Sequence, residues 1–329
     1  MRALARRQLH HGLIFVGPRG VGKAALARGL ACALHCEAAS PGCGRCPACQ
    51  RVLTGHHAGV EWITPDDSAT PGGKIKVETA RELANRLQLA PFEGSAHLVV
   101  FDPADALTEQ ALNALLKALE EPRPGVYFVM ITTGLDRLLP TILSRCLAVR
   151  LGRLASDDVR AVVLAEMERR REAGDETAAA ADAARIDLAV RLSEGSAGLA
   201  VELALDPSLD DALTLLARAV EAAQRGPTGI FAGDKSPLWA AWSQAVGAVK
   251  TGRPARERAV AARTAELWLL HLRESMRGGQ GLPGVPLSRT DDHLGLVRRL
   301  DRLQSFLEGL DRNPNVRLSL EQTLLDISV

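Results

Sequence analysis

Short apolar runs alternate with longer amphipathic segments along the first half of the chain. Each run has the length of a buried strand, and the segments between the runs place apolar residues at helical spacing. The expected strands are Leu13–Val16, Glu61–Thr64, His97–Asp102, Val126–Ile131 and Leu147–Leu151. Strands that alternate with helices favour a parallel sheet covered by helices on both faces. The pattern therefore predicts an α/β domain over residues 1–151.

The pattern changes after Leu151, where short apolar strands give way to segments rich in Ala, Leu, Arg and Glu. Ser156–Asp158 has the composition of a helix N-terminus, with acidic residues in the first turn. Gly174–Ala184 is interpreted as a loop that leads into a helix, and Asp206-Pro207 marks a boundary. From Ser208 onward the spacing predicts only helices. The second half is therefore expected to be all-helical.

The composition is that of an ordinary globular protein of 329 residues, which is long enough for about two or three domains. Net charge is +1, so the chain as a whole does not favour sequence-independent DNA binding. Aromatic residues make up 3%, which argues against a stacking platform for single strands. No run approaches the ~18 apolar residues of a membrane span, and the run after the basic start Met1–Arg7 is too short for a signal peptide. We therefore expect a cytoplasmic protein without a membrane segment.

A glycine-rich segment, Gly17–Ala24, joins the first expected strand to an expected helix over Ala25–Leu34. Strand, glycine-rich loop and helix, with Lys23 at the helix start, form the phosphate-binding arrangement called a P-loop. Backbone N–H groups and the helix N-terminus face an anion there, and the lysine adds a positive charge. Ala24, however, stands where a Ser or Thr would hold Mg²⁺, so the loop is poorly equipped for hydrolysis. The loop residues expected to contact a nucleotide are Gly17, Gly20, Gly22, Lys23 and Ala24.

Two further polar residues end expected strands and add to this candidate site. Asp102 follows a P-loop at the distance where an acid that coordinates Mg²⁺ through its water shell would lie, although a strand-end cap is the alternative. Pro103 follows it, where an ATPase of this type usually has a Glu that polarises water. Thr132 ends the next strand. Ligands bind at the carboxyl ends of parallel strands, so Gly17, Asp102 and Thr132 are expected at one edge of the sheet.

Four of the six cysteines fall within one short segment, Cys36-x6-Cys43-x2-Cys46-x2-Cys49. Thiolates bind Zn²⁺ tetrahedrally, and two-residue spacings let a tight turn present neighbouring sulfurs to one ion. Four protein ligands leave no open position for a substrate water, so the predicted zinc site is structural. Chance thiols in a loop are the alternative. Cys32, one helical turn before Cys36, is interpreted as a core residue.

The chain resembles the clamp-loader branch of the AAA+ ATPases over nearly its whole length. The resemblance rests on the P-loop, on the cysteine cluster directly after the P-loop helix, and on three further segments: Asn113–Pro122, Leu143–Cys146 and Asn315–Glu321. It implies an AAA+ P-loop parallel-sheet domain over residues 1–151 with a zinc module at 36–49. It also implies a small helical lid domain over 152–206 and a helical collar, or oligomerisation, domain over 207–329.

The resemblance also implies partners and a role for Arg145, in the Ser-Arg-Cys motif. In clamp loaders this arginine reaches in trans into the ATP site of the neighbouring subunit as an arginine finger; by itself it would be read as a salt-bridged residue. The implied partners are tau/gamma and delta subunits of a DNA polymerase III hetero-oligomer, a sliding clamp, and primer–template DNA held through the complex.

Three departures from the family pattern separate this chain from a working ATPase. Ala24 replaces the Mg²⁺-binding hydroxyl, Pro103 replaces the catalytic acid, and Gly198 stands where an active ATPase carries a nucleotide-sensing Arg. We therefore expect weak binding of ATP or ADP and little or no ATPase activity. The alternatives are an active tau/gamma-type ATPase and an independent zinc-bearing nucleotide-binding switch. Direct DNA binding through Arg298–Arg302 is disfavoured by the overall charge.

Overall fold

The computed structural model describes residues 9–65, 73–87, 96–234, 236–247, 253–276, 281–286, 293–310 and 315–328. The basic start Met1–Arg7 lies outside these residues. The chain divides into two compact units: residues 1–170 with 183–202, and residues 171–182 with 203–329. The boundaries expected at residues 151 and 206 stay predictions.

The first unit contains a five-stranded, fully parallel sheet with the strand order β2-β3-β4-β1-β5. Its strands are β1 (Gly12–Val16), β2 (Val60–Ile63), β3 (His97–Phe101), β4 (Val126–Thr132) and β5 (Leu147–Arg150). The predicted α/β class is thus confirmed, and each expected strand lies within one or two residues of its observed bounds. The order places β1 between β4 and the edge strand β5, so the segment after β1 leaves the sheet one strand in from that edge.

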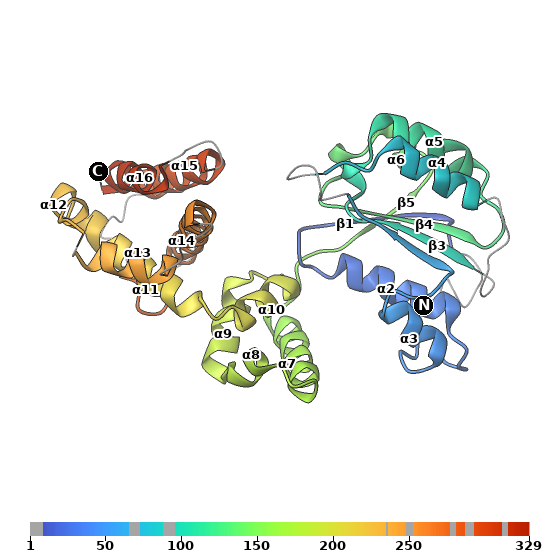
Figure 1. Cartoon of the computed structure of the whole chain (residues 1–329), viewed down its shortest axis with the longest axis horizontal. Helices are drawn as coiled ribbons and strands as arrows, with labels where there is room; N and C mark the ends of the chain where they lie inside the picture. The colour runs from blue at the N-terminus through green and yellow to red at the C-terminus, as the bar shows by residue number, and fades with distance from the viewer. Residues whose placement is uncertain are drawn as a thin grey trace. The chain divides into compact units, whose positions relative to one another are not determined.

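Helices cover both faces of this sheet, as Figure 1 shows. One face carries α2 (Lys23–His35) and α3 (Pro47–Leu53), and the other carries α4 (Val77–Arg86), α5 (Glu109–Glu120) and α6 (Pro140–Leu143). Successive strand residues point to opposite faces, so β1 contributes Leu13 and Phe15 to the first core and Ile14 and Val16 to the second. Two 3-10 turns, Ala104–Ala106 and Leu135–Arg137, follow β3 and β4.

Local sequence explains where the main helices begin and end. The side chain of Thr108 caps α5 by accepting a hydrogen bond from the Ala111 N–H at 3.1 Å, and Pro122 lies two residues after the helix ends. Gly22 precedes α2 with a φ of 93°, a conformation that glycine adopts without strain. These signals place Lys23 at the first position of α2, one residue beyond the loop.

The segment after β5 is helical, as the change in composition predicts. It contains α7 (Ser156–Glu172), α8 (Glu176–Ala180), α9 (Ala183–Leu192) and α10 (Ala197–Leu205). The short helix α8 lies where the sequence was interpreted as a loop. Asp175 explains it, because its carboxylate accepts hydrogen bonds from the backbone N–H groups of Thr177 and Ala178 and so caps the turn.

The second unit is built from helices, and its described residues contain no strand. Besides α8, its helices are α11 (Leu209–Gln224), α12 (Pro227–Ile230), α13 (Pro237–Val246), α14 (Arg253–Met276), α15 (His293–Gly309) and α16 (Val316–Ser328). Trp239 anchors the core at 2% exposure, and its indole N–H donates to the Ile230 carbonyl at 3.3 Å. The ring of Trp242 lies edge-on to the ring of Trp239. The guanidinium of Arg317 lies 4.2 Å from the centroid of the Trp239 ring. The expected all-helical second half is confirmed.

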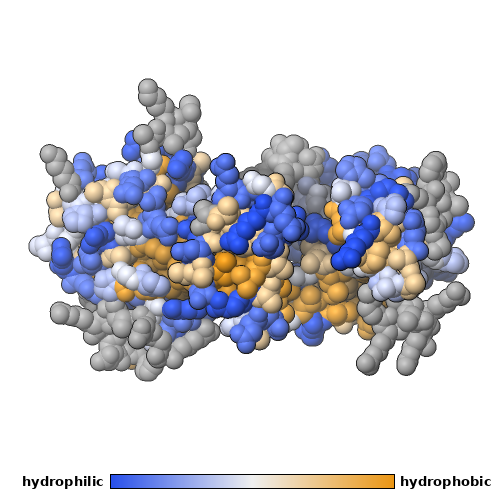
Figure 2. Space-filling view, turned by 90° about the horizontal axis from the view of Figure 1, so that it is seen from below, coloured by the Kyte–Doolittle hydropathy of each residue, from blue (hydrophilic) through white to orange (hydrophobic). Residues whose placement is uncertain are grey.

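The surface is mixed in character. On the face drawn in Figure 2, hydrophobic patches lie between areas of hydrophilic side chains. Within the described residues, none of the helices combines the length and the apolar character needed to cross a bilayer.

Candidate functional site

The P-loop segment leaves the carboxyl end of β1 and is held tightly at its start. The Gly17 N–H donates to the Thr132 carbonyl at 3.3 Å, which ties the loop to the end of β4. A Cβ on Gly17 would lie 2.1 Å from the Leu151 carbonyl oxygen, so only glycine fits beside this backbone. Thr132 is buried, and its hydroxyl donates to the Gly134 carbonyl at 2.9 Å. Gly17 and Thr132 therefore meet at one sheet edge, as expected.

Lys23 turns back onto the loop that precedes it. Its ammonium donates to the carbonyls of Gly17 at 2.7 Å and Pro18 at 2.6 Å, and the residue is 8% exposed. Burial lowers the pKa of Lys23, while the charge of Asp102 raises it. Two of the lysine's three N–H donors thus bond to backbone carbonyls, where a nucleotide-binding loop would aim them at phosphate.

The start of α10 packs directly against the P-loop. The Ser196 hydroxyl donates to the Arg19 carbonyl at 3.1 Å, and the Gly198 N–H donates to the Gly20 carbonyl at 2.8 Å. A Cβ on Gly198 would lie 3.0 Å from the Gly20 Cα, and a Cβ on Gly20 would lie 2.1 Å from the Ser196 Oγ. Glycine at both positions therefore allows two backbones to meet. The sequence pattern did not predict this contact. The one feature of the sequence that could have indicated it is the glycine at position 198, where a side chain would not fit.

Asp102 lies at the end of β3 in a partly buried position. Burial raises the pKa of its carboxyl group, and the charges of Lys23 and Arg28 lower it. Trp62 contributes a hydrogen bond to this carboxylate. The candidate metal-binding acid is therefore already engaged by cationic and indole groups. Ala24 packs against the core and offers no oxygen to a metal.

Arg145 lies at the amino-terminal end of the strands, whereas the P-loop of its own chain lies at their carboxyl end. It precedes β5, which runs parallel to β1 with Leu13 opposite Leu147 and Val16 opposite Arg150. A Cβ on Gly12, at the start of β1, would lie 3.2 Å from the Arg145 carbonyl. A strand rises about 3.3 Å per residue, so the length of β1 separates Arg145 from the loop. The predicted site residues thus fall into two places, with Arg145 apart from the others.

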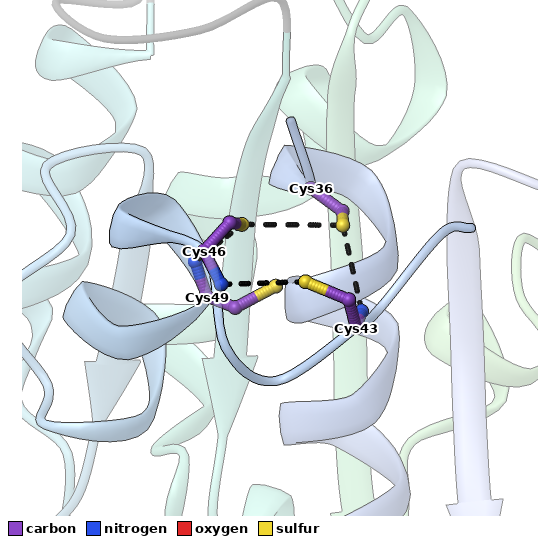
Figure 3. Close-up of side chains that lie close together, drawn as sticks. All are labelled: Cys36, Cys43, Cys46 and Cys49. Carbon is purple, nitrogen blue, oxygen red and sulfur yellow. Dashed lines mark hydrogen bonds between the residues drawn. The ribbon is translucent and has the colours of Figure 1, made fainter. Parts of the chain in front are cut away.

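The four clustered cysteines come together around the end of α2 and the start of α3 (Figure 3). Their sulfur atoms all lie within 4.8 Å of one another, and the Cys36 and Cys46 sulfurs are 4.0 Å apart. A tetrahedral zinc with bonds of about 2.3 Å separates its sulfurs by about 3.8 Å, so the cluster fits a metal ion of this kind. Cys32 lies outside the cluster, 4% exposed in the core, as expected.

Backbone amides point at these sulfurs and favour their charged form. The N–H groups of Cys43, Cys46 and Cys49 donate to the sulfurs of Cys36, Cys43 and Cys46 at 3.4, 3.3 and 3.5 Å. Such bonds lower the pKa of Cys36 to about 6 and also lower the pKa of Cys46, whereas burial raises the pKa of Cys49. Amides that donate to ligand sulfurs are the outer-shell support a thiolate metal site needs.

The parallel sheet, the P-loop segment after β1 and the helical segment that contacts the loop have the arrangement of the AAA+ P-loop fold. Residues 1–155 match the family model described as DNA polymerase III, delta subunit. The DNA polymerase III subunit delta' of Pseudomonas aeruginosa is 38% identical over 143 residues, which are 43% of this chain and 43% of that protein. The subunit tau of Escherichia coli is 39% identical over 160 residues, which are 48% of this chain and 24% of that protein.

A solved structure agrees with the fold over almost the full chain. It is a DNA polymerase III gamma subunit-related protein from Thermotoga maritima, with a TM-score of 0.51 and 18% identity, and it covers 98% of this chain and 96% of that one. At this identity the likeness concerns the fold alone. The sequence matches confirm the clamp-loader resemblance for the N-terminal part, and they span less than half the length of the delta' and tau relatives.

Proposed function

We propose that this chain is a clamp-loader stator subunit of the delta' type, which helps load a sliding clamp onto primed DNA and has little or no ATPase activity. Identity to delta' and to tau is nearly equal, at 38% and 39%, so the choice between them rests on the site. The single observation that carries the proposal is the closed P-loop, in which the Lys23 ammonium bonds to the loop's own carbonyls at Gly17 and Pro18.

The closed loop argues against the alternative of an active tau/gamma-type ATPase. ATP hydrolysis needs amides and a lysine directed at the phosphates and a hydroxyl on Mg²⁺. Lys23 is bonded to its own loop, and Ala24 supplies no hydroxyl. The Lys23 ammonium would have to turn away from the Gly17 and Pro18 carbonyls before it could bind a phosphate. ATP or ADP would therefore bind weakly at most.

The position of Arg145 supports a role in trans. Arg145 lies one strand length from its own P-loop, at the amino-terminal end of the strands. Its side chain is 32% exposed. A planar, always-charged guanidinium that is open to solvent can reach a phosphate carried by a neighbouring molecule. We propose that Arg145 stabilises the charge that develops on the γ-phosphate in the adjacent tau/gamma subunit.

The remaining features fit a subunit of a larger ring. The cysteines Cys36, Cys43, Cys46 and Cys49 would hold a structural Zn²⁺ that fixes the segment between α2 and α3. Residues 207–329 would form this chain's part of a helical collar that assembles with tau/gamma and delta subunits, and primer–template DNA would be held by the complex. An independent zinc-bearing switch would not need this all-helical unit, and it would not co-elute with those subunits.

The experiment that tests the proposal measures ATP turnover by a reconstituted loader with clamp and primed DNA. We expect Arg145→Ala to slow hydrolysis at the neighbouring site by ~10³-fold or more, as for fingers in GTPases, while the complex still co-elutes. Arg145→Lys should not restore the rate, because an ammonium lacks the planar fork. Arg169→Ala is the matched control, since this exposed arginine pairs with Glu166 on its own helix. Unchanged turnover in Arg145→Ala would contradict the finger.

A further inference from the structure

Two motifs that lie 25 residues apart in sequence meet at the Arg145 side chain. Glu120, at the end of α5, accepts a hydrogen bond on its Oε1 from the Arg145 Nη2 at 2.5 Å. The other arm of the guanidinium, Nη1, donates to the Thr141 carbonyl at 3.1 Å and to the Ser144 hydroxyl at 3.0 Å. Both terminal nitrogens of Arg145 are therefore bonded within this chain.

We propose that Glu120 is a positioning residue, a counter-ion that holds Arg145 in a resting orientation and releases it to an incoming phosphate. This inference rests on the proposed role of Arg145 in trans. It gives a function to the segment Asn113–Pro122, which the stator role by itself does not explain. Glu120 is the one acidic residue whose side chain pairs with Arg145 in the described structure.

The exposure of the pair makes release easy. The side chains of Arg145 and Glu120 are 32% and 46% exposed, so water screens their attraction. An exposed pair of this kind shifts an equilibrium by no more than about fivefold. A nucleotide triphosphate carries several negative charges and offers oxygens in the geometry that a guanidinium prefers. The phosphate can therefore replace the single carboxylate of Glu120.

The exchange has a definite kinetic signature. ATP presents its γ-phosphate as soon as it is bound, so Arg145 has to leave Glu120 at the binding step. An interaction broken equally in the bound state and in the transition state changes KM and leaves kcat unaltered. Removal of the carboxylate charge in Glu120→Gln should thus lower the KM for ATP by up to about fivefold at constant kcat.

Glu121 provides a matched control. It is the next residue, it is also exposed, and the described structure records no ion pair between it and Arg145. Glu121→Gln makes the same change in charge and size one position away. A general effect of surface charge on the partner would appear in both variants, whereas a specific effect through Arg145 appears only in Glu120→Gln.

The test measures kcat and KM for ATP in the loader reconstituted with tau/gamma and delta subunits, clamp and primed DNA. It compares Glu120→Gln, Glu121→Gln, Arg145→Ala and the double variant Glu120→Gln/Arg145→Ala, with co-elution to confirm assembly. We expect a lower KM only in Glu120→Gln and no further effect of that change in the Arg145→Ala background.

Three results would overturn the inference while leaving the finger intact: an unchanged KM in Glu120→Gln, a fall in kcat, or the same KM shift in the absence of Arg145. A fall in kcat would mean that Glu120 supports the productive geometry of the arginine. If Arg145→Ala itself leaves turnover unchanged, the proposed function fails as well, so the two failures are distinguishable.

Discussion

The backbone N–H of Gly198 donates a hydrogen bond to the Gly20 carbonyl across 2.8 Å, and so joins the start of α10 to the P-loop. Ser196 adds a second bond to the same loop, at the Arg19 carbonyl. A nucleotide-binding loop needs amides and a lysine directed at phosphate, and here the Lys23 ammonium is directed at the Gly17 and Pro18 carbonyls instead. The contact between these two glycines thus holds α10 against the loop, and the orientation of Lys23 supports the expectation that the chain does not hydrolyse ATP.

We expect Gly198→Ala to destabilise the first unit by about 1–3 kcal/mol, the usual cost of overpacking. The added Cβ would lie 3.0 Å from the Gly20 Cα and 3.2 Å from its carbonyl oxygen, so backbone has to move. Gly29→Ala is the control, because nothing lies within 4 Å of its added Cβ and the position is inside α2. That change should stabilise by about 0.5–1 kcal/mol. Thermal unfolding of both variants checks the prediction, and equal melting temperatures would refute it.

Restoring the missing hydroxyl should not restore ATP chemistry. In Ala24→Thr the Mg²⁺ ligand returns, yet Lys23 remains bonded to the Gly17 and Pro18 carbonyls. We expect no measurable ATPase activity and no tight binding of a fluorescent ATP analogue by the isolated chain. Stoichiometric, Mg²⁺-dependent binding by this variant would show that the closed loop opens readily, which would favour the active-ATPase alternative.

Purified protein should contain one zinc ion per chain, and Cys46→Ser should lose it. Cys46 lies 4.0 Å from Cys36, sulfur to sulfur, and its N–H supports the Cys43 sulfur. A ligand at 100 times its Kd stabilises the folded state by about 2.7 kcal/mol, so metal loss should lower the melting temperature. Elemental analysis and thermal unfolding with and without chelator test this. Cys146→Ser, outside the cluster, should keep its zinc.

The second unit should lose stability as pH falls below about 6.5 because of His271. This histidine is 1% exposed; its Nδ1 accepts from the Leu282 N–H at 3.0 Å, and its Nε2 lies 3.2 Å from the Pro286 carbonyl. Burial lowers the pKa of His271 from its ordinary value of 6.5, so the unfolded chain takes up the proton first. The stabilisation from neutral His271 is complete at pH values above the pKa of the unfolded chain. It is lost as the pH falls through the pKa of the folded chain, at no more than about 1.4 kcal/mol per pH unit.

Unfolding measured between pH 7.5 and 5.0 tests the role of His271. His271→Gln cannot titrate, so its stability should vary less with pH than that of the wild type, whatever its absolute value. His56→Gln alters an exposed residue and should keep the wild-type pH dependence. Parallel curves for the wild type and His271→Gln would rule out His271 as the titrating group.

The sequence alone determined the strands and the identity of the candidate groups, although it did not predict the short helix α8. Apolar runs such as Leu13–Val16 predict strands because a strand covered by helices on both sheet faces needs apolar residues at every position. The described structure confirms the five predicted strands. The cysteine spacing predicted that Cys43, Cys46 and Cys49 would gather, because turns between near neighbours are a local property. The resemblance to clamp loaders likewise rests on short segments that can be read in order.

The tertiary structure decided which of these groups are free to act. Ser196 meets Arg19 across 177 residues and Glu120 meets Arg145 across 25, and no local pattern encodes either pair. Such contacts depend on how α10 packs on the loop after β1 and on where α5 ends relative to β5. The motif at Lys23 shows a phosphate-binding loop, whereas the folded loop bonds the lysine to its own carbonyls, because the direction of a side chain depends on the three-dimensional path of the backbone around it.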